Sequence, residues 1–195
     1  GRVSEYLEAD SVSKVVASKP KEVIQIGWQP PPSGWIRLNT DGSCDENGRI
    51  GCGGILRGSE GEWLGGYAKF IGKGNAYIAE LWGVMEGLEL ARRMKFQAVE
   101  LHVDSFVVVQ ALTNDSIGSP CGSAIIQKIR KLLRLEWEVK VQHAYRETNK
   151  CADALASISC SMRAGSSYYN CCPAQLSSLL LADLMGITFT RLVSL

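Results

Sequence analysis

Four carboxylates stand at points where strands are expected to end or helices to begin. Two of them close alternating runs of apolar and polar residues, and two fall close to the start of a helical pattern. Singly, each has an ordinary explanation, because a carboxylate near a helix start is favoured by about 0.3–1 kcal/mol and an aspartate can cap a helix. The four acids are Asp41, Glu80, Asp104 and Asp153.

Together these four acids indicate a metal site. Carboxylates that converge repel one another unless a cation lies between them, and ligation by carboxylates alone suits Mg²⁺ or Mn²⁺. Two such ions about 3.5–4 Å apart clamp the attacking and the leaving oxygens of a phosphodiester. The chemistry that the residues indicate is therefore phosphoryl transfer to water.

The stretch over residues 35–44 predicts the strand that positions the first acid. Alternation directs Ile36 and Leu38 into a core and leaves Asp41 on an open side, and Gly42 then permits a sharp turn. A strand parallel to this one, over residues 98–104, is expected to end at Asp104. The carboxyl ends of adjacent parallel strands are where such sheets place their sites.

Helical and alternating patterns along the rest of the chain predict an α/β domain. Its mixed sheet has five strands, an antiparallel meander of three plus two parallel strands, and helices flank it. The further strands are expected at 51–57, 62–71, 98–104 and 137–142, and the helices at 75–94, 105–112, 123–135 and 150–162.

Composition sets the domain plan and the class of protein. The 195 residues predict one domain over 35–163, a linker over 1–34 and a tail over 164–195 that holds a short helix.

The net charge of +1 leaves only local patches of positive charge to bind a nucleic-acid partner. Seven cysteines without a CxxC pair predict reduced thiols inside the cell, in the nucleus or cytoplasm, and no apolar run is long enough for a membrane span. The chain begins with Gly, so we expect a fragment, and an upstream organelle-targeting segment stays open.

Around the four acids the chain resembles type 1 ribonuclease H, and more closely the plant retroelement-derived version known as a reverse transcriptase-like domain. The order and the sequence context of the acids carry this resemblance, which covers roughly residues 34–162. The matching motifs are Asn39–Ser43 (NTDGS), Ala79–Leu81 (AEL), Val103–Ser105 (VDS) and His143–Ala156 (HAYRETNKCADALA).

The resemblance implies a complete catalytic site. The four acids would hold two Mg²⁺ ions, or Mn²⁺, with Asp41 shared between them, and His143 would be a mobile histidine that assists proton transfer and product release. The implied reaction is endonucleolytic hydrolysis of the RNA strand of an RNA–DNA hybrid. The expected substrate contacts are Gly42, Ser43, Cys44, Asn75 and Asn149. We expect a monomer, working alone or within a larger reverse transcriptase polyprotein.

Departures from the bacterial pattern bear on how a hybrid is held. Two acids, Asp45 and Glu46, follow the first motif. The interval between the first long helix and the next strand is too short for the basic segment with which bacterial members bind hybrids. Phe106 stands where bacterial members have a polar residue that contacts the hybrid. A second hypothesis is therefore a domesticated, low-activity nucleic-acid-binding domain of retrotransposon origin that uses basic residues over 128–134. A third is a transposase-like or integrase-like nuclease acting on DNA, although the sequence around His143 favours ribonuclease H. His102 is expected to be structural.

Overall fold

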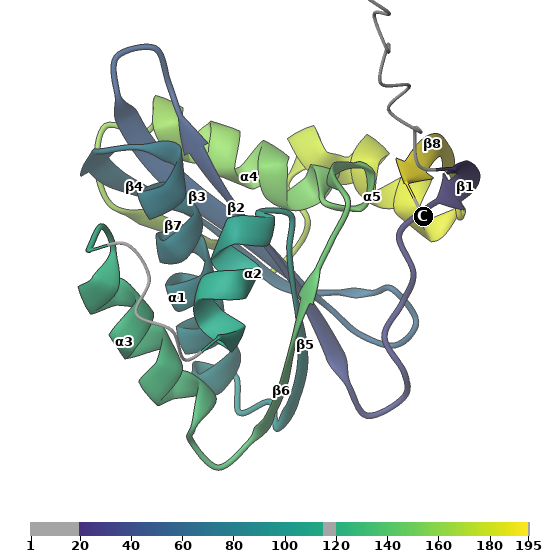
Figure 1. Ribbon diagram of the computed structural model, residues 1–195, viewed down its shortest axis with the longest axis horizontal. Helices are drawn as coiled ribbons and strands as arrows, with labels where there is room; N and C mark the ends of the chain where they lie inside the picture. The colour runs from purple at the N-terminus through teal and green to yellow at the C-terminus, as the bar shows by residue number, and fades with distance from the viewer. Residues whose placement is uncertain (1–19, 115–119, 195) are drawn as a thin grey trace, which may run out of the picture.

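The main sheet of the protein is mixed and places the parallel strands beside the meander. The computed structural model describes residues 20–114 and 120–194, and its larger sheet has six strands in the order β6-β5-β2-β3-β4-β7 (Figure 1). These strands are β2 (Ile36–Cys44), β3 (Arg49–Arg57), β4 (Trp63–Lys73), β5 (Ala98–Val103), β6 (Glu138–His143) and β7 (Ser166–Tyr169). Strands β2, β3 and β4 form the antiparallel meander, and β2, β5 and β6 run parallel.

The predicted α/β class and the arrangement of the five expected strands are confirmed. The expectation of five strands for the sheet is one too low, because β7 pairs antiparallel with the outer edge of β4. It lies in the segment expected to be a tail. Its short length and serine-rich sequence give little alternation to recognise.

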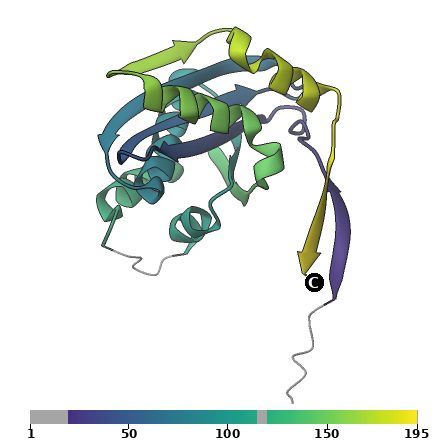
Figure 2. The same cartoon turned by 90° about the horizontal axis from the view of Figure 1, so that it is seen from above.

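Helices cover both faces of the sheet (Figure 2). On one face lie α1 (Ala76–Arg93), α2 (Phe106–Thr113) and α3 (Ser123–Leu133), and on the other α4 (Lys150–Ser161) and α5 (Ser177–Leu184). The main core, which includes Leu38, Leu88 and Leu101, lies under the first group, and a smaller core around Ile55 and Leu155 lies under the second. Short 3-10 turns, η1 (Arg146–Thr148) and η2 (Ala174–Leu176), precede α4 and α5. None of the described helices combines the length and the apolar character that a membrane crossing requires.

The predicted turn at Gly42 is wrong. Strand β2 continues to Cys44, and the turn follows it at Asp45, whose carbonyl accepts a hydrogen bond from the amide of Gly48 at 3.0 Å. Gly42 instead lets α1 approach the strand, because a Cβ built on it would lie 2.2 Å from the backbone nitrogen of Glu80. The glycine is thus required by a contact across the fold rather than by a bend.

Two further strands pair outside the main sheet. Strands β1 (Lys21–Ile26) and β8 (Phe189–Ser194) form an antiparallel two-stranded sheet, here called the terminal ribbon, which Figure 2 shows extending from the body of the molecule. The sequence patterns predicted neither strand, since β1 lies in the expected linker and β8 in the expected tail. Most of that linker, residues 1–19, lies outside the described residues.

A buried ion pair anchors the segments next to the terminal ribbon to the domain. Arg57 of β3 is fully buried and its Nη1 donates to Oδ2 of Asp183 in α5 at 2.7 Å. Trp28, which follows β1, packs its ring on the Arg57 guanidinium at 3.6 Å and donates from Nε1 to Asn39 at 3.1 Å. Both flanks of the domain are therefore tied to central strands.

Candidate active site

Three of the four predicted acids meet at one end of the parallel strands. One carboxylate oxygen each from Asp41, Glu80 and Asp104 lies within 4.8 Å of the other two. The parallel pairing of β2 with β5 ends at the pair Thr40 and Val103, so Asp41 in β2 and Asp104 just after β5 are the next residues along each chain segment. Glu80 is contributed by α1. This helix packs closely against β2 because Gly42 has no side chain.

Burial makes this cluster costly in its ionised form. Asp41 is 4% exposed, so the expectation that it faces an open side is wrong. Burial, followed by the charge of Asp104, raises the pKa of Asp41, and burial, followed by the charge of Asp41, raises the pKa of Glu80. Burial also raises the pKa of Asp104, although the nearby Arg146 opposes that shift.

These features fit a divalent cation. Among the described residues, Oε2 of Glu80 is buried without a hydrogen-bond partner. A buried polar atom without a partner is costly, and carboxylates whose pKa values are raised by mutual repulsion are relieved by a bound cation. The donor set consists of oxygens alone, which is the set that Mg²⁺ or Mn²⁺ prefers.

The fourth acid, Asp153, stands beside this cluster rather than within it. It lies in the first turn of α4 and lines a cavity of about 180 Å³ together with Asp104, Arg146 and Lys150. Its charge contributes to raising the pKa values of Asp41 and Asp104, which places it within electrostatic reach of both. The structure therefore groups three acids tightly and sets the fourth across a cavity from them.

His143, at the end of β6, is tied to this site through the backbone. Its Nε2 donates to the carbonyl oxygen of Asp104 at 3.0 Å, so this nitrogen carries the proton in the neutral ring. The edges of Phe106 and Tyr145 approach the ring, with centroids 5.7 and 5.9 Å away. The exposed imidazole is thus held at the mouth of the acidic site between two aromatic side chains.

Four of the five expected substrate contacts lie in the last residues of β2 or at the start of α1, the two elements that carry Asp41 and Glu80. Gly42 donates its amide to Oδ1 of Asp41 at 2.9 Å, Ser43 is half-buried, and Cys44 is exposed at the end of β2. Asn75 is exposed and caps α1, accepting from the amide of Ile78 at 3.0 Å. These positions are accessible or border the acids, and contact with a substrate stays a prediction for them.

Asn149, the fifth expected contact, is a buried structural residue in this fold. It is 1% exposed, donates to the carbonyl of Thr40 at 3.0 Å and accepts from Nδ2 of Asn39 at 3.1 Å. Both ends of its amide are therefore engaged. Its effect is to fix the start of α4 against β2, the strand that carries Asp41.

Arg146 is a residue of the site that sequence reasoning did not single out. Its Nε lies 3.6 Å from Oδ2 of Asp104, while its side chain is 89% exposed. The available signal was its place three residues after His143, inside the last motif. His102, expected to be structural, is largely buried, and burial lowers its pKa to about 4.

Comparison with known proteins identifies the family. The chain matches the reverse transcriptase-like family over residues 39–159, a range that contains all four acids and His143, and it belongs to this family. It is also 39% identical to an Arabidopsis thaliana protein named "Putative ribonuclease H protein", over 179 residues that make up 91% of this chain and 29% of that protein. The chain thus spans less than a third of the length of that relative.

Solved structures confirm the ribonuclease H fold. RNase H1 from the halophilic archaeon Halobacterium salinarum NRC-1 matches with a TM-score of 0.61 and 27% identity, covering 64% of this chain and 96% of that one. LC11-RNase H1, solved in complex with an RNA/DNA hybrid, matches with a TM-score of 0.58 and 24% identity, covering 63% and 94%. The second likeness concerns the fold alone.

Proposed function

We propose that this domain is a metal-dependent nuclease that hydrolyses the RNA strand of RNA–DNA hybrids. The observation that carries the proposal is the cluster of Asp41, Glu80 and Asp104, with one oxygen of each within 4.8 Å of the others. Support also comes from the Arabidopsis relative that bears a ribonuclease H name and from the LC11 enzyme, which was solved with a hybrid bound.

The acids would hold the metal ions. Asp41, Glu80 and Asp104 together with Asp153, which lines a cavity with Asp104, would hold two Mg²⁺ or Mn²⁺ ions. When bound, such ions stabilise the charge that develops on the phosphodiester in the transition state. Asp41, Glu80 and Asp104 are buried or half-buried and already lie close together, so little rearrangement is needed for a cation to bind.

The remaining groups act on protons and on the substrate backbone. His143 holds its Nε2 proton at the mouth of the site and would act there as a general acid or base. Arg146 and Lys150 border the same cavity and offer positive charge to a phosphate. We propose that the domain works as a monomer, either alone or within a larger polyprotein.

The test is cleavage of a labelled RNA–DNA hybrid in Mg²⁺, beside single-stranded RNA, duplex DNA and an EDTA arm. The wild type should cut the hybrid selectively, and Asp41→Asn should lose activity by at least about 100-fold because an acid of the cluster is gone. Asp45→Asn is the matched control, since Asp45 lies in the turn after β2 and its role in that turn needs only one side-chain oxygen.

Other outcomes separate the alternatives. A folded wild type that binds the hybrid equally with and without Mg²⁺ and never cleaves it would contradict the proposal and favour the domesticated binding domain. Selective cleavage of duplex DNA would instead favour a nuclease of the transposase or integrase kind. Equal loss of activity in Asp41→Asn and Asp45→Asn would refute a specific role for the cluster.

A further inference from the structure

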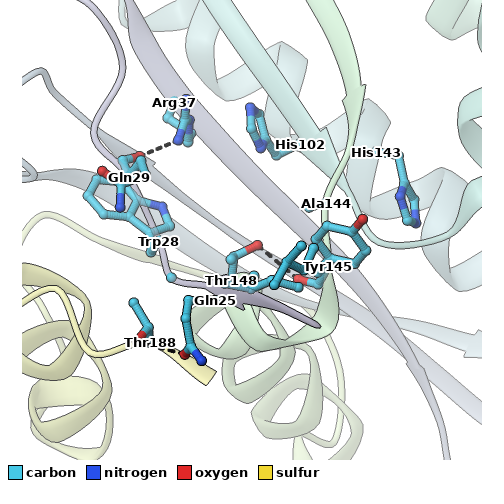
Figure 3. Close-up of a pocket in the computed structure, with 13 residues that line it drawn as sticks. Gln25, Trp28, Gln29, Arg37, His102, His143, Ala144, Tyr145, Thr148 and Thr188 are labelled. Atoms are coloured by element: carbon cyan, nitrogen blue, oxygen red, sulfur yellow. Dashed lines mark hydrogen bonds between the residues drawn. The ribbon is translucent and has the colours of Figure 1, made fainter. Parts of the chain in front are cut away.

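A second cavity lies between the terminal ribbon and the catalytic domain. Its volume is about 380 Å³, and we call it the terminal pocket (Figure 3). Six consecutive residues, 24–29, form one wall, and Figure 3 places Gln25 and Thr188 opposite Tyr145 and Thr148. Its other lining residues are Arg37, His102, His143 and Ala144. The volume falls in the range of small-molecule sites and is sufficient for a single nucleoside.

The walls of the terminal pocket are mostly apolar, and the described residues that form them carry no unpaired charge. Arg37 is neutralised by an ion pair with Glu100 and also donates to the carbonyl of Gln29. Burial lowers the pKa of His102 to about 4, so its ring is neutral at pH 7. A phosphate, a carboxylate or a cation would find no opposite charge here, and the chemistry favours an uncharged ligand.

Polar and aromatic groups in the pocket suit a flat ligand with a hydrogen-bonding edge. Gln25, Thr148 and Thr188 line the pocket and bring amide and hydroxyl groups to it. Tyr145 provides an aromatic wall, and the guanidinium of Arg191 lies 4.9 Å from its ring centroid and holds it in place. A nucleobase combines these properties, since it is uncharged, stacks on aromatic rings and carries donors and acceptors on its edge.

The pocket adjoins the acidic site. His143 lines it and also donates to the carbonyl of Asp104. Tyr145 lines the terminal pocket, whereas the next residue, Arg146, lines the acidic cavity with Asp104 and Asp153. Because Tyr145 and Arg146 are successive residues, with Cα atoms about 3.8 Å apart, the two cavities adjoin at this point of the chain.

We propose that the terminal pocket binds one unpaired nucleobase of a strand that extends beyond the hybrid and passes His143. This inference rests on the proposed function, because the acidic cavity must hold the same strand. The pocket wall formed by residues 24–29 and Thr188 lies outside the 39–159 range of the family match. The pocket is thus formed jointly by the matched domain and by flanking residues that the family match does not include.

The test compares blunt hybrids with hybrids that carry an unpaired extension of one to three nucleotides at each end of each strand. The extension contains 2-aminopurine, whose fluorescence falls when the base stacks. We expect one extended end to lower KM by about fivefold to 100-fold, as one stacked base does, with quenched fluorescence. Equal KM values for every hybrid and unchanged fluorescence would overturn the proposal.

Two tryptophan variants make the test specific. Thr188→Trp places a large ring at the exposed mouth of the pocket, whereas Leu192→Trp changes an exposed residue of β8 that does not line it. The first should abolish the preference for the extended hybrid while leaving cleavage of the blunt hybrid unchanged. The second should keep the preference. A preference that survives Thr188→Trp would refute the pocket as its cause.

A titration with nucleosides separates this inference from the proposed function. Adenosine, guanosine, cytidine and uridine are added to ¹⁵N-labelled wild type, and amide shifts of Gln25, Gly27 and Tyr145 are followed. Saturable shifts that vanish in Thr188→Trp would support the pocket even if no hybrid were cleaved. No shift at millimolar nucleoside would overturn it even if cleavage were normal.

Discussion

The backbone carbonyl of Asp104 accepts a hydrogen bond from Nε2 of His143 at 3.0 Å, while the side chain of Asp104 belongs to the acidic cluster. One residue therefore connects the proton-carrying ring to the carboxylates. The exposed ring can leave this carbonyl at small cost, because a single hydrogen bond to a neutral carbonyl contributes only about 1 kcal/mol and Phe106 and Tyr145 contact the ring only by their edges.

Replacement of His143 tests its part in proton transfer. His143→Ala should lower kcat by about 100-fold with KM nearly unchanged, because general acid–base groups contribute about 10²–10⁴ in rate. Phe106→Leu, which removes one neighbouring ring, should retain most of kcat and serves as the control. Steady-state cleavage across pH 5.5–9 measures both parameters. A rise in KM with unchanged kcat would contradict the assignment and make His143 a substrate contact.

Stability without metal should depend on pH through the acidic cluster. The pKa values of Asp41 and Glu80 are raised in the folded state, so the folded protein binds more protons than the unfolded chain. Stability is then highest below the unfolded carboxyl pKa near 4 and falls as pH rises towards the folded pKa values, with a slope of about 1.4 kcal/mol per pH unit for each carboxyl group. In EDTA, Asp41→Asn should therefore raise Tm at pH 8 by several degrees and at pH 4.5 by far less.

The same melting curves reveal the bound cation. Mg²⁺ should raise the Tm of the wild type at pH 8 and have little effect on Asp41→Asn, because binding to the native state alone stabilises it. Asp45→Asn should follow the wild type in EDTA at both pH values and in Mg²⁺ at pH 8. Equal Mg²⁺ effects on all three proteins would show that the ion acts elsewhere.

The ion pair between Arg57 and Asp183 should be important for stability. Asp183→Asn leaves the fully buried Arg57 without its counter-charge, which costs about 3–5 kcal/mol of unfolding free energy. The partly exposed pair of Arg49 and Asp45, with 3.7 Å between Nε and Oδ2, is the comparison, and Asp45→Asn should cost about 1 kcal/mol or less. Urea unfolding measures both. If Asp183→Asn lost as little unfolding free energy as Asp45→Asn, the charge of Arg57 would have to be compensated by other groups.

Arg191 should restrain the turn that carries Arg146. Its Nη1 lies 3.0 and 2.9 Å from the two oxygens of Glu147, and its guanidinium also lies over the ring of Tyr145. Because this pair is partly exposed, Arg191→Gln should change global stability by no more than about 1 kcal/mol. Hydrogen exchange at the amides of Thr148 and Asn149 should nevertheless become faster.

Glu147→Gln is the matched partner variant for that experiment. It should produce the same local increase in exchange, and the double variant should add nothing further, since both single changes remove one interaction. Arg134→Gln, at the exposed end of α3, is the control and should leave these amides unaffected. Additive effects of the two single variants would contradict a shared restraint.

Much of the fold could be predicted from the sequence because it follows from local patterns of apolar and polar residues. Alternation over residues 35–44 and 98–104 gives neighbouring strands that end in acids, and the helical pattern from Asn75 places Glu80 on the sheet side. These patterns predicted that four acids meet, whereas the structure groups Asp41, Glu80 and Asp104 and leaves Asp153 beside them. They did not predict that Asp41 is buried, because burial depends on helices contributed by distant parts of the chain.

The features that were missed depend on long-range partners. Gly42 indicates a turn when only its neighbours are considered, whereas its actual role is set by the approach of α1. Strands β1 and β8 pair with each other from opposite ends of the described chain, so neither has a local partner to reveal it. The terminal pocket depends on that pairing and was equally invisible.

The pairing of Lys21 with Ser194 has a mechanical consequence. Tension applied between these two residues pulls the strands of the terminal ribbon apart from the Lys21–Ser194 pair onwards. Its hydrogen bonds therefore break one after another rather than all at once. The ribbon would thus peel apart at low force, until the load reaches Trp28 and the buried contact between Arg57 and Asp183. The ribonuclease H-like domain beyond that point would be shielded from the applied force.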